Sequence, residues 1–421
     1  MIRSAAGPAA ARWGPYALAG TLLLVDYLWL SRSLSLVGTH YGPSALNRGD
    51  YNDVLSLSSL HYLRPGHIIH PIPYVDDRIE YPVLLGLTLW LPTWLPGGPA
   101  TWFAAAGVLT AAATFGSIAL LRRHHPASVW WIAASPALLL DGGINWDLIG
   151  IFFLVGGVVW LGERRLGLSG ASTALGTCFK LFPVVVAPMA VAALGSRWSR
   201  ARSGRATAPG TDAAGRDVAR WVVPFGAVSA VVFVPFLILN ASNTLWFIRF
   251  NDLRPQKDSL WELPARVLGS TLVGSGTINA LSLVAVVAAV AYGARMVWLT
   301  PEPAQFRSVT LATALTMVVW MGVNKVWNPQ YILWVFAASA LAGMPARFGV
   351  ALGALSVYDY GFEFILRRPD QHNPYLWVAY IMEVARTVLF VLMVVWVVAR
   401  LRAGRHAPAE PVGGNPAAVA T

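Results

Sequence analysis

The chain has 421 residues, of which 56% are hydrophobic and 12% charged, and its mean hydropathy is +0.56. A soluble domain has too little interior to hide that much apolar surface, so the composition excludes a water-soluble protein and predicts an all-α integral membrane protein. The net charge of +11 sits in short clusters beside apolar segments, which indicates membrane topology and argues against a nucleic-acid partner. The single cysteine, Cys178, leaves no pair for a disulfide framework within the chain.

Apolar segments of roughly the 20 residues that a bilayer requires recur along the chain. The first, at about 13–37, follows Arg3 and Arg12 without a convincing cleavage site, which favours an uncleaved span over a signal peptide. Two shorter pieces between 168 and 197 meet at "FKLFP". Further spans are expected at about 100–121, 126–141, 147–162, 221–240, 276–294, 307–323, 329–345, 348–365 and 376–400.

Arginine-rich connections assign the two sides of the membrane. The clusters "RRHH", "ERR", "SRWSRARSGR" and "RLRAGRH" are expected in the cytoplasm, which gives about twelve spans in one polytopic domain, 1–400, with both termini inside. The basic loop 196–220 is a candidate contact for anionic lipid headgroups, and the tail 401–421 is expected to be disordered. The outer polar stretches are then 38–80, 141–147, 241–275 and 324–330.

The segment 81–98, "YPVLLGLTLWLPTWLPGG", does not fit this topology. It is long enough to cross the membrane, yet a crossing would break the parity that the basic clusters require. Either the segment is re-entrant or one of the neighbouring spans is misplaced.

The first outer loop contains "YNDVLSLSSLHYL", in which Asp53 begins an apolar, helical run. Leu55, Leu57 and Leu60 suit a juxtamembrane helix that lies flat in the interface. Two roles are open to Asp53: N-cap of that helix, or general base that takes a proton from a hydroxyl nucleophile.

The end of this loop, "PYVDDRIEYP", carries adjacent carboxylates at Asp76 and Asp77. Such a pair can bind a divalent cation, but it is more common in a hydrophilic turn, so a cation is left open and no metal site is assigned. The loop histidines lack the spacing of zinc ligands on a helix. The candidates of this loop for contacting a sugar or acceptor are Tyr51, His67, His70, Tyr74 and Glu80.

Lys180, in "GTCFKLFP", follows the cytoplasmic "ERR" by about fifteen residues, so helical rise brings it to the outer half of the membrane. A lysine at that depth needs a negative partner. One alternative is a salt bridge to Asp26, Asp141 or Asp147, or snorkelling to the interface. The other is the phosphate of a lipid substrate.

The stretch "NKVWNPQYILW" places amides, a cation and aromatic rings between two spans on the outer side. Its aromatic residues are either interfacial anchors or platforms of a sugar-binding subsite. Arg249, Arg254 and Lys257 add cations to the same side, which an anionic ligand would explain. Candidates for sugar or acceptor binding outside the first loop are Asn145, Asp147, Asn324, Trp327 and Gln330.

The motifs "YNDV", "IPYVDDRIEYPVLLG", "NWDLIG", "GTCFKLFP" and "NKVWNPQYILW" occur in this order over about 45–345. In this they resemble the polytopic GT-C glycosyltransferases of actinobacteria, and more narrowly glycosyltransferase family 87, which includes polyprenol-phosphate-mannose-dependent α-mannosyltransferases. The resemblance implies a GT-C-type bundle with juxtamembrane helices in a long first extracytoplasmic loop. Asn52 departs from the family pattern, where Ser is frequent before the aspartate.

The resemblance implies that Asp53 is the catalytic base, that Lys180 contacts the lipid phosphate, and that Asn324 and Lys325 line the same cavity. Lys325 and Arg254 join Lys180 as candidate ligands of the donor phosphate. The chain has no P-loop, no strand followed by GxGxxG and no soluble domain large enough to bind a nucleotide, which favours a lipid-linked donor.

The expected function is inverting transfer of a sugar, with mannose favoured over arabinofuranose, from a polyprenyl-phosphate donor to a lipid or glycan acceptor. The site would face the extracytoplasmic side of the plasma membrane. A transporter or flippase of a lipid-linked glycan is the alternative, for which Asp359 and Glu363, four residues apart, would share a helical face as a cation or proton site. A structural subunit of an envelope-building complex is the third class.

Overall fold

The computed structural model describes residues 8–38, 41–61, 71–204, 211–264, 274–366 and 376–405. Within these ranges every regular secondary-structure element is a helix, and the only β pairing consists of two isolated bridges. The prediction of an all-α chain is therefore confirmed. Six helical segments of the described residues are long and apolar enough to cross a membrane: Gly98–His124, Phe182–Arg202, Asp212–Leu253, Ser275–Leu299, Glu302–Val323 and Trp377–Arg405. These six are compatible with a membrane protein, while the count of about twelve spans stays a prediction.

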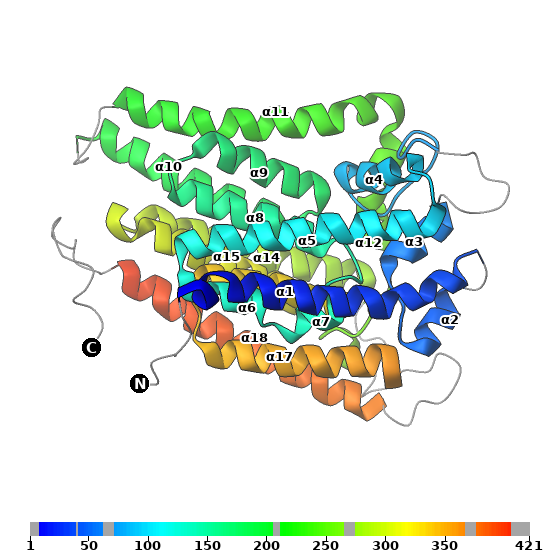
Figure 1. Ribbon diagram of the computed structural model, residues 1–421. Coiled ribbons are helices and arrows are strands. Elements are labelled where there is room, and N and C mark those ends of the chain that lie inside the picture. The colour runs from blue at the N-terminus through cyan, green and yellow to red at the C-terminus, as the bar shows by residue number, and fades with distance from the viewer. Residues whose placement is uncertain are drawn as a thin grey trace.

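The long helices lie roughly parallel in one bundle (Figure 1). α8 is central, with α5, α9 and α16 packed around it. The α-helices are α1 (Pro8–Leu30), α2 (Tyr41–Arg48), α3 (Asp53–His61), α4 (Val83–Trp90), α5 (Gly98–His124), α6 (Trp130–Ala133), α7 (Pro136–Asp141), α8 (Asp147–Gly162), α9 (Leu166–Phe179), α10 (Val186–Arg202), α11 (Thr211–Thr244), α12 (Trp246–Leu253), α14 (Ser275–Leu299), α15 (Glu302–Val323), α16 (Ile332–Ala342), α17 (Ala346–Tyr360) and α18 (Leu376–Arg405). The short 3-10 helices are η1 (Ser31–Leu36), η2 (Leu91–Trp94), η3 (Pro126–Val129), η4 (Phe182–Val185) and η5 (Pro329–Tyr331), and η6 (Gly361–Leu366) is a π-helix.

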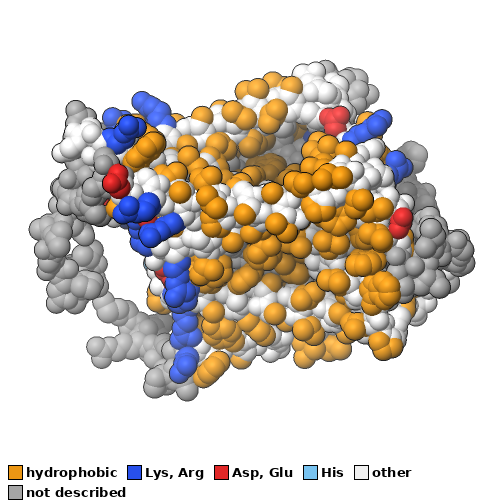
Figure 2. All heavy atoms as spheres, turned by 90° about the horizontal axis from the view of Figure 1, so that it is seen from above, with side chains coloured by type: hydrophobic (Ala, Val, Ile, Leu, Met, Phe, Trp, Pro, Cys, Tyr) orange, Lys and Arg blue, Asp and Glu red, His pale blue; other side chains and the backbone are white. Residues whose placement is uncertain are grey.

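The two ends of the bundle differ in charge. Lys and Arg side chains gather at the end where α1 begins and α18 ends, and hydrophobic side chains cover the length between the ends (Figures 1 and 2). Arg122 and Arg123 occupy the last turn of α5, and Arg200 and Arg202 the last turn of α10. The opposite end carries α2, α3, α4 and α12 (Figure 1). The described arginine-rich clusters that the sequence assigns to one side of the membrane therefore lie at one end of the helix bundle.

The segment 81–98 does not form a crossing helix. α4 and η2 together run over Val83–Trp94, twelve residues or about 18 Å at helical rise, against the ~30 Å of a hydrocarbon core. Gly97 and Gly98 follow with φ values of 106° and 64°, a left-handed conformation that lets the chain reverse into α5. The segment is thus too short to cross as a helix, while the choice between a re-entrant segment and a misplaced neighbouring span stays open.

Three expected spans are interrupted. The stretch 126–141 consists of η3, α6 and α7, because Pro126 begins the first piece and Pro136 begins the last, where the Ser135 side chain caps α7 by accepting from the Ala137 amide at 3.1 Å. The span at 13–37 ends as an α-helix at Leu30 and continues as η1, and the span at 348–365 passes from α17 into η6. α18 extends to Arg405, beyond the expected start of the disordered tail, and residues 406–421 lie outside the described ones.

The first outer loop is folded onto the bundle. Val54 and Leu55 of α3 are fully buried, and they pack in a second hydrophobic cluster with Tyr74, Trp102 and Trp146. A short helix does start at Asp53, as the sequence predicts, and its orientation relative to a membrane stays a prediction.

Candidate active site

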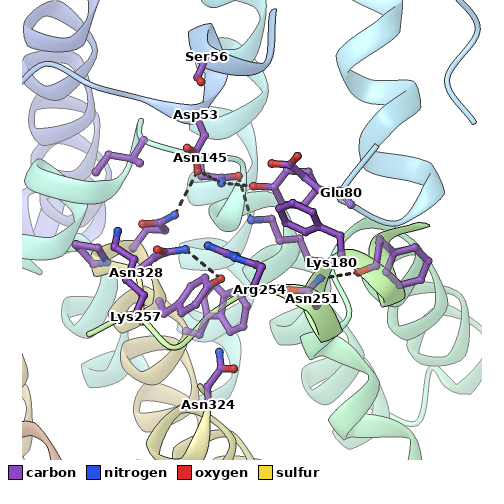
Figure 3. A pocket seen from close by; sticks show the side chains of 18 of the residues that line it. Asp53, Ser56, Glu80, Asn145, Lys180, Asn251, Arg254, Lys257, Asn324 and Asn328 are labelled. Atoms are coloured by element: carbon purple, nitrogen blue, oxygen red, sulfur yellow. Dashed lines mark hydrogen bonds between the residues drawn. The ribbon is translucent and has the colours of Figure 1, made fainter. Parts of the chain in front are cut away.

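A cavity of about 790 Å³ opens where this loop meets the bundle, within the size range of small-molecule sites. Its walls come from the first outer loop, the turn before α8, the break after α9, α12, the loop after α15, and η6 (Figure 3). Sequence candidates from distant parts of the chain meet there: Tyr51, Asp53, Glu80, Asn145, Lys180, Arg254, Asn324 and Gln330 all line it.

Asn52, and not Asp53, caps α3. The Asn52 Oδ1 atom accepts from the Leu55 amide at 2.8 Å, and the Asn52 carbonyl accepts from the Ser56 amide at 3.2 Å, which is the geometry of an N-cap. Asp53 is thus the first residue inside the helix, and its own amide donates to the Ile144 carbonyl at 2.8 Å. The capping role considered for Asp53 belongs to its neighbour, which leaves the Asp53 carboxylate for the cavity.

Uncharged donors hold the Asp53 carboxylate. The Tyr51 hydroxyl donates to Oδ1 at 2.9 Å, Asn145 Nδ2 donates to Oδ2 at 2.6 Å, and Gln330 Nε2 lies 3.5 Å from Oδ2. Among the described residues no cation lies within ion-pair distance of this carboxylate. Burial raises the pKa of Asp53, while the Tyr51 hydrogen bond, the Lys180 charge and the Asn145 hydrogen bond lower it. A carboxyl group whose pKa is raised is a stronger base than a solvated one.

Asn145 connects Asp53 to a buried ion pair. Its Nδ2 also donates to the Tyr81 hydroxyl at 2.9 Å, and its Oδ1 accepts from Lys180 Nζ at 3.0 Å and from the Trp146 amide at 2.7 Å. These partners fix which way the carboxamide faces, with the NH2 group toward Asp53. The turn between α7 and α8 therefore orients the carboxylate.

Lys180 is the first residue after α9, in an extended conformation with φ −145° and ψ 132°. Its Nζ lies 2.7 Å from Asp147 Oδ1, and both side chains are almost fully buried, at 6% and 1% exposure. The Trp334 indole donates to the same Asp147 oxygen at 2.9 Å. Of the partners considered for Lys180, the structure shows Asp147, so this ammonium is already neutralised within the protein.

The other cations near the cavity differ in their partners. Lys257 Nζ forms an ion pair with Glu363 Oε1 at 2.5 Å. Lys325 Nζ donates to the Asp252 carbonyl at 2.6 Å and lines a smaller neighbouring pocket, and burial lowers the pKa of Lys325. Arg254 ends α12 and lines the main cavity, and no carboxylate of the described residues lies within ion-pair distance of it. Arg254 is therefore the cation there with charge to offer an anion.

Several sequence candidates lie elsewhere. Tyr74 is fully buried, and its hydroxyl donates to the Tyr81 and Pro82 carbonyls at 2.9 and 2.8 Å, so it braces α4 rather than facing the cavity. Asp147 does not line the cavity but pairs with Lys180 behind the wall. His67 and His70 lie outside the described residues.

Trp327 is a core residue, 3% exposed, rather than a sugar platform. Its indole donates to Asp359 Oδ2 at 2.9 Å, and the Arg386 guanidinium lies over its ring at 4.1 Å. Asp359 also forms an ion pair with Arg386, whereas Glu363 turns to Lys257. The structure therefore does not bring Asp359 and Glu363 together as a shared cation or proton site.

The cavity also contains three residues that the sequence analysis did not single out: Tyr81, Asn251 and Trp334. Four more lining residues were noted in the sequence but not assigned to the site: Lys257, Asn328, Tyr331 and Glu363. Most of them neighbour selected residues in the stretches 241–275 and 324–330, whose polar and aromatic composition was the available signal. Glu363 was considered only with Asp359 as a cation or proton site, and nothing in the apolar run "GFEFIL" indicates that it lines this cavity.

No metal site is assigned to Asp76 and Asp77, whose carboxylates accept from the Ile72 and Arg78 amides, both at 2.8 Å, as in a turn. In the described part of the chain, one other group brings three acidic side chains within reach of a shared cation: Asp258, Glu262 and Glu383. The Asp258 amide donates to Glu262, and the Asp258 carbonyl accepts from Arg386. Those contacts serve packing between the loop after α12 and α18.

No protein-family model matches this chain, and a search of curated proteins finds no similar sequence. What the site can do is therefore inferred from its own residues.

Proposed function

We propose that the protein is an inverting glycosyltransferase that moves a sugar, most simply mannose, from a polyprenyl-phosphate donor to a hydroxyl group of a lipid or glycan acceptor. The observation that carries this proposal is the position of Asp53. Its carboxylate faces a cavity of the size of an enzyme site. Asn52 caps the helix in its place, and the Asp53 carboxylate accepts hydrogen bonds from neutral donors instead of pairing with a cation. The resemblance to family 87 of the GT-C glycosyltransferases supports the same role.

In the proposed reaction, Asp53 takes the proton of the acceptor hydroxyl as the oxygen attacks C1 of the donor sugar. The new C1–O bond forms on the face opposite the phosphate, and the bond between C1 and the phosphate oxygen breaks. Its electron pair leaves with the polyprenyl phosphate. A single carboxylate suffices for this displacement, and it inverts the configuration at C1.

The leaving phosphate gains negative charge, which a prepositioned cation stabilises. Arg254 suits that role because it lines the cavity without a carboxylate partner in the described residues, and its planar guanidinium can bind phosphate in a bidentate manner. Lys180 was expected to be the phosphate ligand, but its pairing with Asp147 favours a positioning role through Asn145.

An apolar exterior suits a polyprenyl donor. The most hydrophobic window of α11 has no buried residue, and the face seen in Figure 2 is mainly hydrophobic with a hollow in it. Phe247, Ile248 and Phe250 of α12 bring apolar side chains to the cavity wall. We place the site at the extracytoplasmic side of the plasma membrane, because it lies toward the end of the bundle opposite the basic clusters.

The test is sugar transfer by the purified protein in liposomes, with radiolabelled polyprenyl-phosphate mannose as donor and membrane lipids as acceptor. Asp53→Asn keeps the size of the side chain but not its basicity, so transfer should fall by about 10²- to 10⁴-fold. Asp76→Asn, a carboxylate change in a turn of the same loop, is the matched control. Equal activity of wild type and Asp53→Asn would reject the catalytic role. Inactivity of the wild type with mannose and arabinofuranose donors alike would favour a transporter or flippase.

A further inference from the structure

A second, smaller pocket of about 280 Å³ adjoins the main cavity. It lies between the end of α12, the first turns of α14 and the loop after α15. The two pockets share three lining residues, Asn251, Asn324 and Tyr331. Only these side chains separate the small pocket from the main cavity.

The small pocket carries no net charge. Asp252 and Lys325 are the charged residues among its described lining, and they have opposite signs. Both are engaged: the Asp252 carboxylate accepts from Asn279 Nδ2 at 2.6 Å, and the Lys325 ammonium donates to the Asp252 carbonyl at 2.6 Å. An anion would find no available cation here, in contrast to the main cavity with Arg254.

The remaining polar lining consists of carboxamides and a hydroxyl, beside the ring of Tyr331. A carboxamide both donates and accepts, which matches the adjacent hydroxyl groups of a carbohydrate. Within the described residues the Asn324 side chain makes no hydrogen bond to the protein, so its donor and acceptor groups are available to a ligand. An uncharged, hydroxyl-rich ligand fits this chemistry best.

The small pocket is remote from the reacting carboxylate. Figure 3 shows Asp53 and Asn324 at opposite ends of the cavity side chains, with Arg254 and Asn328 between them. A sugar in the small pocket is therefore not the one that reacts at Asp53. Since a monosaccharide-phosphate donor has one sugar, which must lie at the reacting end, a further sugar has to belong to the acceptor.

Building on the glycosyltransferase function proposed above, we propose that this pocket is a subsite for a neutral, non-reacting sugar of the acceptor. The protein then prefers acceptors with at least two sugar units. Asn324 offers both a donor and an acceptor to the distal sugar. The side-chain oxygens of Ser282 and Asn279 accept from it, because Ser282 Oγ already donates to the Val323 carbonyl at 2.6 Å and Asn279 Nδ2 donates to Asp252. Tyr331 packs against the sugar at the junction.

The experiment compares octyl α-mannoside with octyl glycosides of two and three mannose units as acceptors. In the wild type, kcat/KM should rise roughly tenfold from one sugar to two, as one or two added hydrogen bonds would give. Asn279→Ala, which removes a carboxamide, and Ser282→Leu, which fills the space, should reduce the ratio of two-sugar to one-sugar kcat/KM toward one. Asn47→Ala, an exposed asparagine outside both pockets, is the matched control.

A wild-type ratio near one, or a ratio unchanged in Asn279→Ala and Ser282→Leu, would overturn the subsite while leaving the transferase intact. If the wild type transfers no sugar to any acceptor, the proposed function fails, and saturation-transfer NMR with methyl α-mannobioside then decides the subsite alone. Binding of methyl α-mannobioside to the wild type that is lost in Ser282→Leu would support the subsite. Absent binding, or equal binding by both proteins, would reject it.

Discussion

Asn145 Nδ2 and Asp53 Oδ2 lie 2.6 Å apart although 92 residues separate them in the chain. The same carboxamide accepts from Lys180 at 3.0 Å, so a buried ion pair and the proposed catalytic base share one orienting group.

Asn145→Ala is expected to lower turnover by about 10²-fold, because the Asp53 carboxylate loses the donor that orients it. Since the Asn145 hydrogen bond lowers the pKa of Asp53, its removal should raise that pKa. The base works only when deprotonated, so activity is lost as the pH falls through this pKa. The acid limb of kcat/KM should therefore move to higher pH in the variant. An acid limb at the wild-type position would contradict the assignment of Asn145.

Lys180→Met should destabilise the protein by about 3–5 kcal/mol, because it leaves the buried Asp147 carboxylate without its ion partner. Asp147→Asn in the same background removes that uncompensated charge and keeps an acceptor for the Trp334 indole. The double variant should then be more stable than the sum of the two single changes predicts. Unfolding in detergent, followed by tryptophan fluorescence, measures this. Additive losses would mean that the two side chains are not coupled.

Arg254→Gln should raise the KM for the polyprenyl-phosphate donor roughly 10- to 100-fold, the range expected for losing a charge-assisted hydrogen bond. Arg249→Gln removes an exposed arginine of the same helix that does not line the cavity, and it should leave the KM near the wild-type value. If Arg249→Gln raised the KM for the donor as much as Arg254→Gln does, the loss of donor binding would be due to the general positive charge of the surface and not to a specific contact. Steady-state kinetics at fixed ionic strength distinguishes the two results.

Asn52→Ser should keep the stability of the wild type within about 0.5 kcal/mol, because serine also caps helices well. Asn52→Ala should cost about 1–2 kcal/mol, since it removes the acceptor of the Leu55 amide. Both variants retain Asp53. Thermal unfolding of the purified variants tests this, and a loss in Asn52→Ser equal to that in Asn52→Ala would show that the side chain matters for something other than capping.

The sequence identified the helical class, the basic end and eight of the residues that line the cavity. It left the role of Asp53 open, because Asn52 and Asp53 are both good capping residues, and a shift of one position decides which of them accepts from the Leu55 amide. Nor could it tell Trp327 from Tyr331. Both are aromatic and four residues apart, but η5 turns the chain between them, so Tyr331 lines the cavity and Trp327 donates to Asp359.

Breaks in spans were harder to predict than the spans themselves. A hydropathy window averages over Pro136, where α7 starts afresh, and over Gly361, where α17 becomes a π-helix. Glu363 reaches Lys257, 106 residues away, only because the bundle brings η6 beside the loop after α12. Pairings of that range depend on packing that no local pattern encodes.

The cavity wall draws on the whole length of the chain, from Gly42 to Phe364. Asp53 and Gln330, whose side chains lie 3.5 Å apart in its wall, are separated by 277 residues in the chain. During synthesis the residues of this wall therefore emerge in stages, and the cavity can close only after η6, which carries Glu363 and Phe364, has left the ribosome. A chain that ends before η6 contains Asp53 but lacks part of the cavity wall. Truncated products should therefore be inactive in sugar transfer.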